Sequence, residues 1–246
     1  MALLEVKQLT KHFGGLTAVG DVTLELNEGE LVGLIGPNGA GKTTLFNLLT
    51  GVYEPSEGTV TLDGHLLNGK QPYKIAALGL GRTFQNIRLF KDLTVLDNVL
   101  IAFSNHHKQH VFASFLRLPA FYKNEKELKA KALELLKIFD LDGDAETLAK
   151  NLAYGQQRRL EIVRALATEP KILFLDEPAA GMNPQETAEL TELIRRIKDE
   201  FKITIMLIEH DMSLVMEVTE RIYVLEYGRL IAHGTPDEIK NNKRVI

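Results

Sequence analysis

The run of residues 36–43 constrains the fold more than any other segment. It reads Gly-Pro-Asn-Gly-Ala-Gly-Lys-Thr and fits G-x-x-x-x-G-K-[ST] at every fixed position. Residues 31–35 before it are an unbroken apolar run, typical of a central strand covered on both faces, and residues 44–49 after it have a helical pattern. Glycine lets the backbone curl so that successive N–H groups point at phosphate oxygens, and the helix adds its positive N-terminal end. The segment therefore predicts strand, phosphate-binding loop and helix, the beginning of an α/β fold.

Two side chains of this loop suit a nucleoside triphosphate with Mg²⁺. Lys42 can reach the β- and γ-phosphates, and the Thr43 hydroxyl can coordinate the metal. The alternative is an ordinary glycine-rich turn. With an average glycine content of ~7%, a chance match in a chain of this length is on the order of 1%. The pattern therefore indicates a nucleotide site.

A second apolar run, 172–175, ends in Asp176 and Glu177. In a doubly wound sheet, that end of a strand opens onto the ligand crevice. Asp176 suits Mg²⁺, because hard cations prefer carboxylate oxygen, and Glu177 suits the polarisation of an attacking water. Alone, this pattern fits a plain turn equally well, but the phosphate loop in the same chain favours the functional interpretation.

Gln85 and His210 also follow predicted strands, 82–84 and 203–209. A lone glutamine is usually a solvated side chain, and a lone histidine is more often structural than catalytic. By position alone, a structural role and a role beside the crevice are equally supported for both.

The remaining pattern indicates one α/β domain with a helical insertion. Val22, Leu24 and Leu26 alternate with polar residues as in a strand, Asp63-Gly64 predicts a hairpin, and 125–136 has helical periodicity. Strand signals return after residue 170, separated by a helical run at 185–201. We expect residues 1–85 and 157–246 to form the nucleotide-binding core and 86–156 a helical subdomain.

Composition excludes several classes of protein. A net charge of −4 gives no reason to expect nucleic-acid binding, and the absence of cysteine excludes disulfides and thiolate metal sites. No stretch reaches the ~18–20 apolar residues of a transmembrane helix, and the first residues do not form a signal peptide. If the protein serves a membrane, we expect it to do so as a bound partner. For His106, His107 and His110, a solvated loop is favoured over a metal site.

As a whole, the chain resembles the ATP-binding subunits of ABC transporters, and the resemblance covers essentially its full length. Residues 152–156, Leu-Ala-Tyr-Gly-Gln, lie where the family has its LSGGQ signature. Gln85 matches the family's Q-loop glutamine, His210 its switch histidine and Phe13 its adenine-stacking aromatic residue. Segments 13–16, 82–85, 88–90, 152–155 and 209–212 are most similar to the first of the two ATPase subunits of branched-chain amino-acid importers.

The resemblance implies a P-loop NTPase core with an N-terminal antiparallel β region and an inserted helical subdomain. It implies catalysis by Glu177, which activates water, with His210 at the γ-phosphate and Lys42 and Gln85 assisting. It implies that Mg²⁺ is held by Thr43, Gln85 and Asp176. The nucleotide-binding residues so implied are Phe13, Gly36, Pro37, Asn38, Gly39, Ala40, Gly41, Lys42, Thr43, Thr44, Gly155 and Gln156.

The resemblance also implies a dimer that sandwiches two ATP molecules at the cytoplasmic face of the membrane. Gly155 and Gln156 would face the γ-phosphate of the partner's ATP, and permease subunits and a substrate-binding protein would complete the transporter. Ala153 and Tyr154 depart from the signature, and Asn183 stands where most members have Asp. Another cargo (urea, a short amide or a lipid) and a soluble ABC ATPase of translation or DNA repair are the alternatives.

Overall fold

The computed structural model describes residues 2–104 and 119–245, so the three histidines at 106, 107 and 110 lie outside the described residues. The chain folds into two compact units, Met1–Arg82 with Lys171–Ile246, and Thr83–Pro170. The predicted boundary after residue 156 falls inside helix α6 (Tyr154–Leu166), which belongs entirely to the second unit. A boundary inferred from motifs divides this helix, but its continuous hydrogen-bonded backbone keeps it in one unit.

The first unit contains a four-stranded antiparallel sheet in the order β2-β1-β4-β5. The predicted alternation in β2 is confirmed, since Val22, Leu24 and Leu26 are buried between exposed neighbours. The predicted hairpin is also confirmed: Asp63 and Gly64, both with positive φ, join β4 to β5. The strands are β1 (Ala2–Phe13), β2 (Leu16–Asn27), β4 (Glu57–Leu62) and β5 (His65–Leu66).

A six-stranded sheet in the order β10-β9-β3-β8-β7-β6 carries the nucleotide-binding elements. Its strands are parallel except β10, which pairs antiparallel with β9. Every residue of β3, β7 and β8 is buried, as expected of strands covered on both faces. The strands are β3 (Leu31–Ile35), β6 (Leu80–Arg82), β7 (Ile172–Asp176), β8 (Thr204–Ile208), β9 (Arg221–Glu226) and β10 (Arg229–Gly234).

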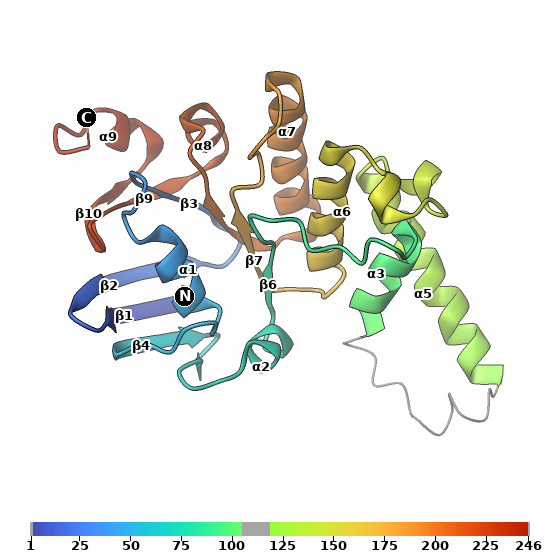
Figure 1. The fold of residues 1–246 in the computed structure, drawn as a ribbon, viewed down its shortest axis with the longest axis horizontal. Coiled ribbons are helices and arrows are strands. Elements are labelled where there is room, and N and C mark those ends of the chain that lie inside the picture. Colours follow the sequence, from blue (N-terminus) through green and yellow to red (C-terminus); the bar gives the residue numbers. More distant parts are fainter. Residues whose placement is uncertain (1, 105–118, 246) are drawn as a thin grey trace. The chain divides into compact units, whose positions relative to one another are not determined.

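Helices cover the two faces of this sheet (Figure 1). Helix α1 lies between the two sheets, where Phe46 stacks on Phe174 with ring centroids 4.8 Å apart. On the other face, Val215 of α8 and Ile239 of α9 form a second cluster with β9. The helices of this unit are α1 (Lys42–Leu49), α2 (Pro72–Ala77), α7 (Pro184–Phe201), α8 (Met212–Val218) and α9 (Pro236–Lys240).

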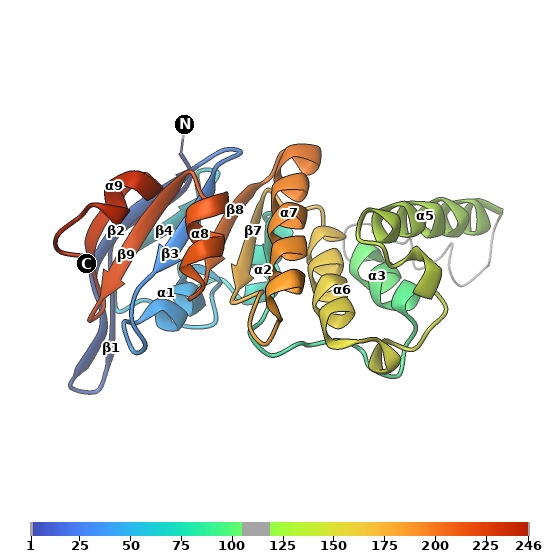
Figure 2. The same cartoon turned by 90° about the horizontal axis from the view of Figure 1, so that it is seen from above.

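The second unit consists mainly of α3 (Val95–Ser104), α5 (Pro119–Ile138) and α6, which contact one another (Figure 2). Its core is apolar, with Val95, Val99, Ala132, Leu136, Phe139 and Leu160 among the buried residues. The fold class predicted from the sequence is thus confirmed. Within the described part of the chain, no helix is both long enough and apolar enough to cross a membrane.

A buried ion pair anchors the first segment of this helical unit. The fully buried Arg158 pairs with Glu161 at 3.0 Å and donates to the carbonyl oxygens of Phe84 at 2.7 Å and Gln85 at 2.8 Å. Glu161 accepts from the backbone N–H groups of Phe84 and Arg88. Burial raises the pKa of Glu161, although the Arg158 guanidinium and these N–H groups oppose the rise. Helix α6 therefore fixes the backbone around Gln85.

We expect Arg158→Met to lower the free energy of unfolding by about 3–5 kcal/mol, because it leaves the Glu161 carboxylate buried without its counter-charge. Arg159→Met is the matched control: Arg159 is next along the helix, partly exposed, and 3.9 Å from the exposed Asp140. Its loss is expected to cost at most about 1 kcal/mol. Urea denaturation of both variants measures the difference, and equal small losses would contradict the anchoring role.

Candidate nucleotide-binding site

The loop between β3 and α1 is shaped by backbone packing. Gly41 takes the N-cap position of α1 with φ of 98°, and a Cβ atom there would lie 2.6 Å from the carbonyl oxygen of Ala18 in β2. Only glycine tolerates both the conformation and the approach. No side chain in the described residues caps α1. Its first N–H groups therefore suit an anion such as phosphate.

Lys42 is held by the loop itself. Its Nζ donates to the carbonyl oxygens of Gly36 at 2.6 Å and Pro37 at 3.0 Å, and the side chain is buried. Burial lowers the pKa of Lys42, opposed by the charge of Glu177. Thr43, the next residue, is exposed. The loop thus presents an ammonium group and a hydroxyl group at the same helix end.

An open cleft of about 530 Å³ adjoins this loop. Its size is in the range of small-molecule sites. It brings together the loop, one aromatic residue from β1 and two polar residues that follow β7 and β8. The lining residues are Phe13, Leu16, Thr17, Ala18, Asn38, Gly39, Ala40, Gly41, Lys42, Thr43, Thr44, Glu177, His210, Tyr227 and Gly228.

Asp176 is buried at the end of β7 and interacts with Arg82 of the adjacent strand β6. Arg82 Nη2 lies 3.4 Å from Asp176 Oδ2, and Nη1 donates to Thr50 Oγ1 at 2.6 Å. Arg82 therefore links the carboxylate to the residue that follows α1. Sequence reasoning did not identify it, because a contact between β6 and β7 has no local pattern.

A hydroxyl group and a carboxylate are oxygen donors that suit Mg²⁺. In proteins this ion usually has few side-chain ligands and keeps several water or substrate phosphate ligands. Thr43 and Asp176 would hold the ion. The described residues contain no group of three or more His, Cys, Asp or Glu that could hold a metal.

Glu177 and His210 meet at the cleft. His210 Nε2 lies 2.8 Å from Glu177 Oε1. Glu177 has φ of 47°, an uncommon left-handed backbone for a residue with a side chain, and its N–H donates to the Ile208 carbonyl at 2.9 Å. Such backbone strain concentrates at functional sites. The pair places a carboxylate and an imidazole where a water beside a bound phosphate could be held.

A further carboxylate, Glu209, positions both loops that carry this pair. It is buried and accepts hydrogen bonds from the N–H groups of Ala179 at 2.7 Å and His210 at 2.9 Å. Burial raises the pKa of Glu209. The sequence signal for Glu209 is its position between a buried strand and His210. In the sequence analysis, Glu209 appears only within segment 209–212 of the family resemblance.

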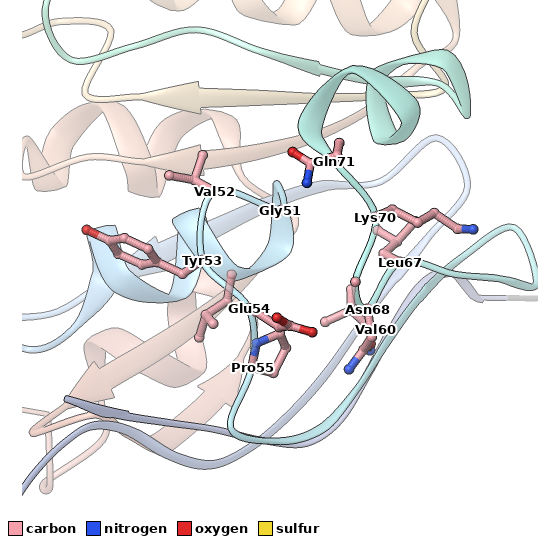
Figure 3. Close-up of a pocket in the computed structure, with 12 residues that line it drawn as sticks. Gly51, Val52, Tyr53, Glu54, Pro55, Val60, Leu67, Asn68, Lys70 and Gln71 are labelled. Atoms are coloured by element: carbon pink, nitrogen blue, oxygen red, sulfur yellow. The ribbon is translucent and has the colours of Figure 1, made fainter. Parts of the chain in front are cut away.

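Phe13 is braced by two neighbours. The ring of Tyr53 meets it edge to face at 5.4 Å, and Lys11 Nζ lies 5.2 Å from its centroid. Lys11 also donates to the carbonyl of Glu54 at 2.7 Å. Tyr53 in turn borders a smaller pocket of about 210 Å³, lined entirely by residues between 48 and 71 (Figure 3). The larger cleft, which contains the phosphate loop, is the candidate nucleotide site.

The helical unit holds the other predicted residues. Gln85 is exposed, and its carbonyl is bound by Arg158. Gly155 and Gln156 lie in the first turn of α6. Gln156 Oε1 accepts from the Ala153 N–H at 3.1 Å, and its Nε2 donates to Asp144 at 2.8 Å. The Gln156 side chain therefore satisfies the N–H group of Ala153, the N-cap residue of α6.

We expect Glu177→Gln to keep nucleotide binding and lower the hydrolysis rate at least a hundredfold. Glutamine retains the size and the hydrogen bond to His210 but cannot accept a proton, and general-base catalysis contributes ~10²–10⁴ in rate. Nucleotide affinity by titration calorimetry and phosphate release measure the two effects. Turnover within tenfold of the parent would show that the base is elsewhere.

Comparisons with known proteins agree with this geometry. A family model described as ABC transporter matches residues 19–180, and one described as branched-chain amino acid ATP-binding cassette transporter matches residues 229–246. The chain is 52% identical to the high-affinity branched-chain amino acid transport ATP-binding protein LivG of Salmonella typhimurium, over 99% of this chain and 96% of LivG.

Two solved structures are similar over nearly the whole chain. The ADP conformation of MJ1267, an ATP-binding cassette of an ABC transporter, has a TM-score of 0.86 and 31% identity, covering 100% of this chain and 97% of that one. The dimeric post-hydrolysis state of the ATP-binding cassette MJ0796 bound to ADP and Pi has a TM-score of 0.79 and 27% identity, covering 95% and 98%. The chain therefore belongs to the ABC transporter family, and it is an ATP-binding cassette that hydrolyses ATP to drive transport.

Proposed function

We propose that this cassette powers the import of branched-chain amino acids, at the cytoplasmic face of the membrane, by closing as a dimer around two ATP molecules. The observation that carries the ATPase role is the cleft that gathers the phosphate loop, Phe13, Glu177 and His210. The proposal that the cargo is a branched-chain amino acid rests on the full-length similarity to LivG, whose name states branched-chain amino acid transport.

Hydrolysis then follows from the positions of the side chains. The loop N–H groups and Lys42 hold the phosphates, and Phe13 stacks on adenine. Glu177, held by His210, accepts a proton from the attacking water, and His210 stabilises the γ-phosphate. Mg²⁺ held by Thr43 and Asp176 would neutralise charge that develops on the phosphate oxygens.

The signature segment is proposed to act on the partner's nucleotide. Ala153 is the N-cap of α6 and offers no side-chain acceptor to its first turn, so the N–H groups of Gly155 and Gln156 are available to a phosphate. The positive end of the helix, equivalent to about +0.5 of an elementary charge, supports this role. The dimeric MJ0796 structure shows that related cassettes pair.

The segment after Gln85 is proposed to contact the permease. Asn86, Arg88 and Phe90 are exposed, with 45% of the Phe90 surface accessible. The guanidinium of Arg164 lies 4.7 Å from the Phe90 ring, and Arg164 also donates to the Arg88 carbonyl. The surface therefore combines an exposed aromatic ring with polar and charged side chains, and its backbone is held in place, as a docking site requires. Asn98 is buried and binds the Phe90 backbone from within.

Transport in proteoliposomes tests the cargo. The chain is reconstituted with its permeases, second ATPase subunit and binding protein, and the uptake of labelled leucine, isoleucine and valine is measured with urea, a short amide and a lipid as competitors. We expect ATP-dependent uptake of the three amino acids and its loss in Glu177→Gln. Uptake of another cargo instead would contradict the proposal. Failure to assemble with any permease would favour a soluble ABC ATPase.

Two substitutions test the signature. Ala153→Ser restores a hydroxyl group at the N-cap of α6. It should change ATPase activity less than about threefold, because the backbone N–H groups and the positive helix end that are proposed to bind the phosphate stay in place. Gly155→Asp brings a carboxylate against the partner's γ-phosphate and should abolish ATP-driven dimerisation, with monomer nucleotide affinity near normal. Light scattering and calorimetry measure both, and normal dimers from Gly155→Asp would reject the role in trans.

A further inference from the structure

Tyr227 has an unusual place in the cleft. It lies in the two-residue turn Tyr227-Gly228 that joins β9 to β10, and its side chain lines the nucleotide cleft. It is not among the nucleotide-binding residues predicted from the sequence. Its side chain is 86% exposed. None of the nucleotide-binding roles described above uses this residue.

The backbone at Tyr227 is unfavourable for an aromatic residue. Its φ is 45° and that of Gly228 is 75°, as in a type I′ turn, where Asn, Asp and Gly are strongly preferred. Bulky residues at positive φ are outliers that call for an explanation. Among the described residues with side chains, those at positive φ are Gln8, Asp21, Asp63, Asp140, Glu169, Glu177, Lys202 and Tyr227, and Tyr227 alone is aromatic.

Packing does not compensate for this conformation, because the side chain is almost fully exposed. A residue that departs from a local preference without a structural gain points to function. Among the described non-glycine residues with positive φ, Glu177 is the other one that lines this cleft.

The turn is fixed to the phosphate loop, so Tyr227 is placed by the backbone. The Gly228 N–H donates to the carbonyl of Ala40 at 2.8 Å, and its own carbonyl accepts from the Gly20 N–H at 2.8 Å. A Cβ atom on Gly228 would lie 2.6 Å from the Ala18 carbonyl oxygen. Any movement of the turn would therefore disturb the loop that holds the phosphates.

We infer that Tyr227 is a second aromatic contact for the nucleoside of the bound nucleotide, on the same cleft as Phe13. The inference rests on the proposed nucleotide site. An adenine base is planar and has two faces, and an aromatic ring stacks on such a surface without needing a hydrogen bond. Tyr227 thus favours nucleotides over bare polyphosphates.

Tyr227→Asn tests the inference, because Asn suits the turn and removes only the ring. We expect it to raise the Kd for ATP and ADP about fivefold or more and to leave the Kd for inorganic tripolyphosphate within about twofold. The melting temperature should stay the same or rise, since the turn is relieved. Tyr227→Phe keeps the ring and should bind ATP as the parent does. Tyr73→Asn, a change to another exposed tyrosine outside the cleft, is the matched control and should leave ATP affinity unchanged.

Calorimetric titration of the full chain measures each affinity. Unchanged ATP affinity in Tyr227→Asn would overturn the inference, and so would an equal loss for tripolyphosphate, which would show that the residue acts through the loop. A parent chain that binds tripolyphosphate but not ATP would overturn the inference and leave the phosphate loop intact. A parent that binds neither would overturn the nucleotide site itself.

Discussion

The nucleotide site depends on close backbone contacts of the phosphate loop and of the β9–β10 turn with the carbonyl oxygen of Ala18. Gly41 at the start of α1 and Gly228 in the β9–β10 turn both approach this oxygen so closely that a Cβ atom on either would lie 2.6 Å from it. The antiparallel sheet, the phosphate loop and the edge of the six-stranded sheet are joined there without side chains. Because of this contact, Phe13 from β1, the loop, and Tyr227 from the turn border one cleft.

Buried charges determine the rest of the arrangement. Glu209 binds the backbone of two loops in the first unit, and the Arg158–Glu161 pair binds the backbone around Gln85 in the second. In each case a buried charged side chain holds backbone N–H or carbonyl groups near a residue with a chemical role. Breaking such a contact leaves a charge without a partner, so these groups define the loops more firmly than surface ion pairs could.

Local patterns predicted the parts of the molecule that local forces determine. The apolar run at 31–35, the alternation in β2, the Asp63-Gly64 hairpin and the phosphate loop have their signals within a few residues, and all were found in the expected structures. Arg82 and Tyr53 act through contacts between segments far apart in the chain, which no local pattern reveals. The predicted end of the helical insertion, after residue 156, falls inside α6 for a related reason. The signature motif lies at the start of this helix, whereas the buried contacts along the whole helix place it in the second unit.

The way Lys42 is held has a consequence for how the site responds to its surroundings. The ammonium group is already out of water and bound by the carbonyls of Gly36 and Pro37. A ligand that replaces those carbonyls exchanges one set of polar contacts for another and does not have to strip a hydrated cation, so less reorganisation accompanies binding. A charge enclosed in this way is also less screened by dissolved ions than one on the surface. The loop is thus a preorganised receptor, whose attraction for an anion resists changes in ionic strength.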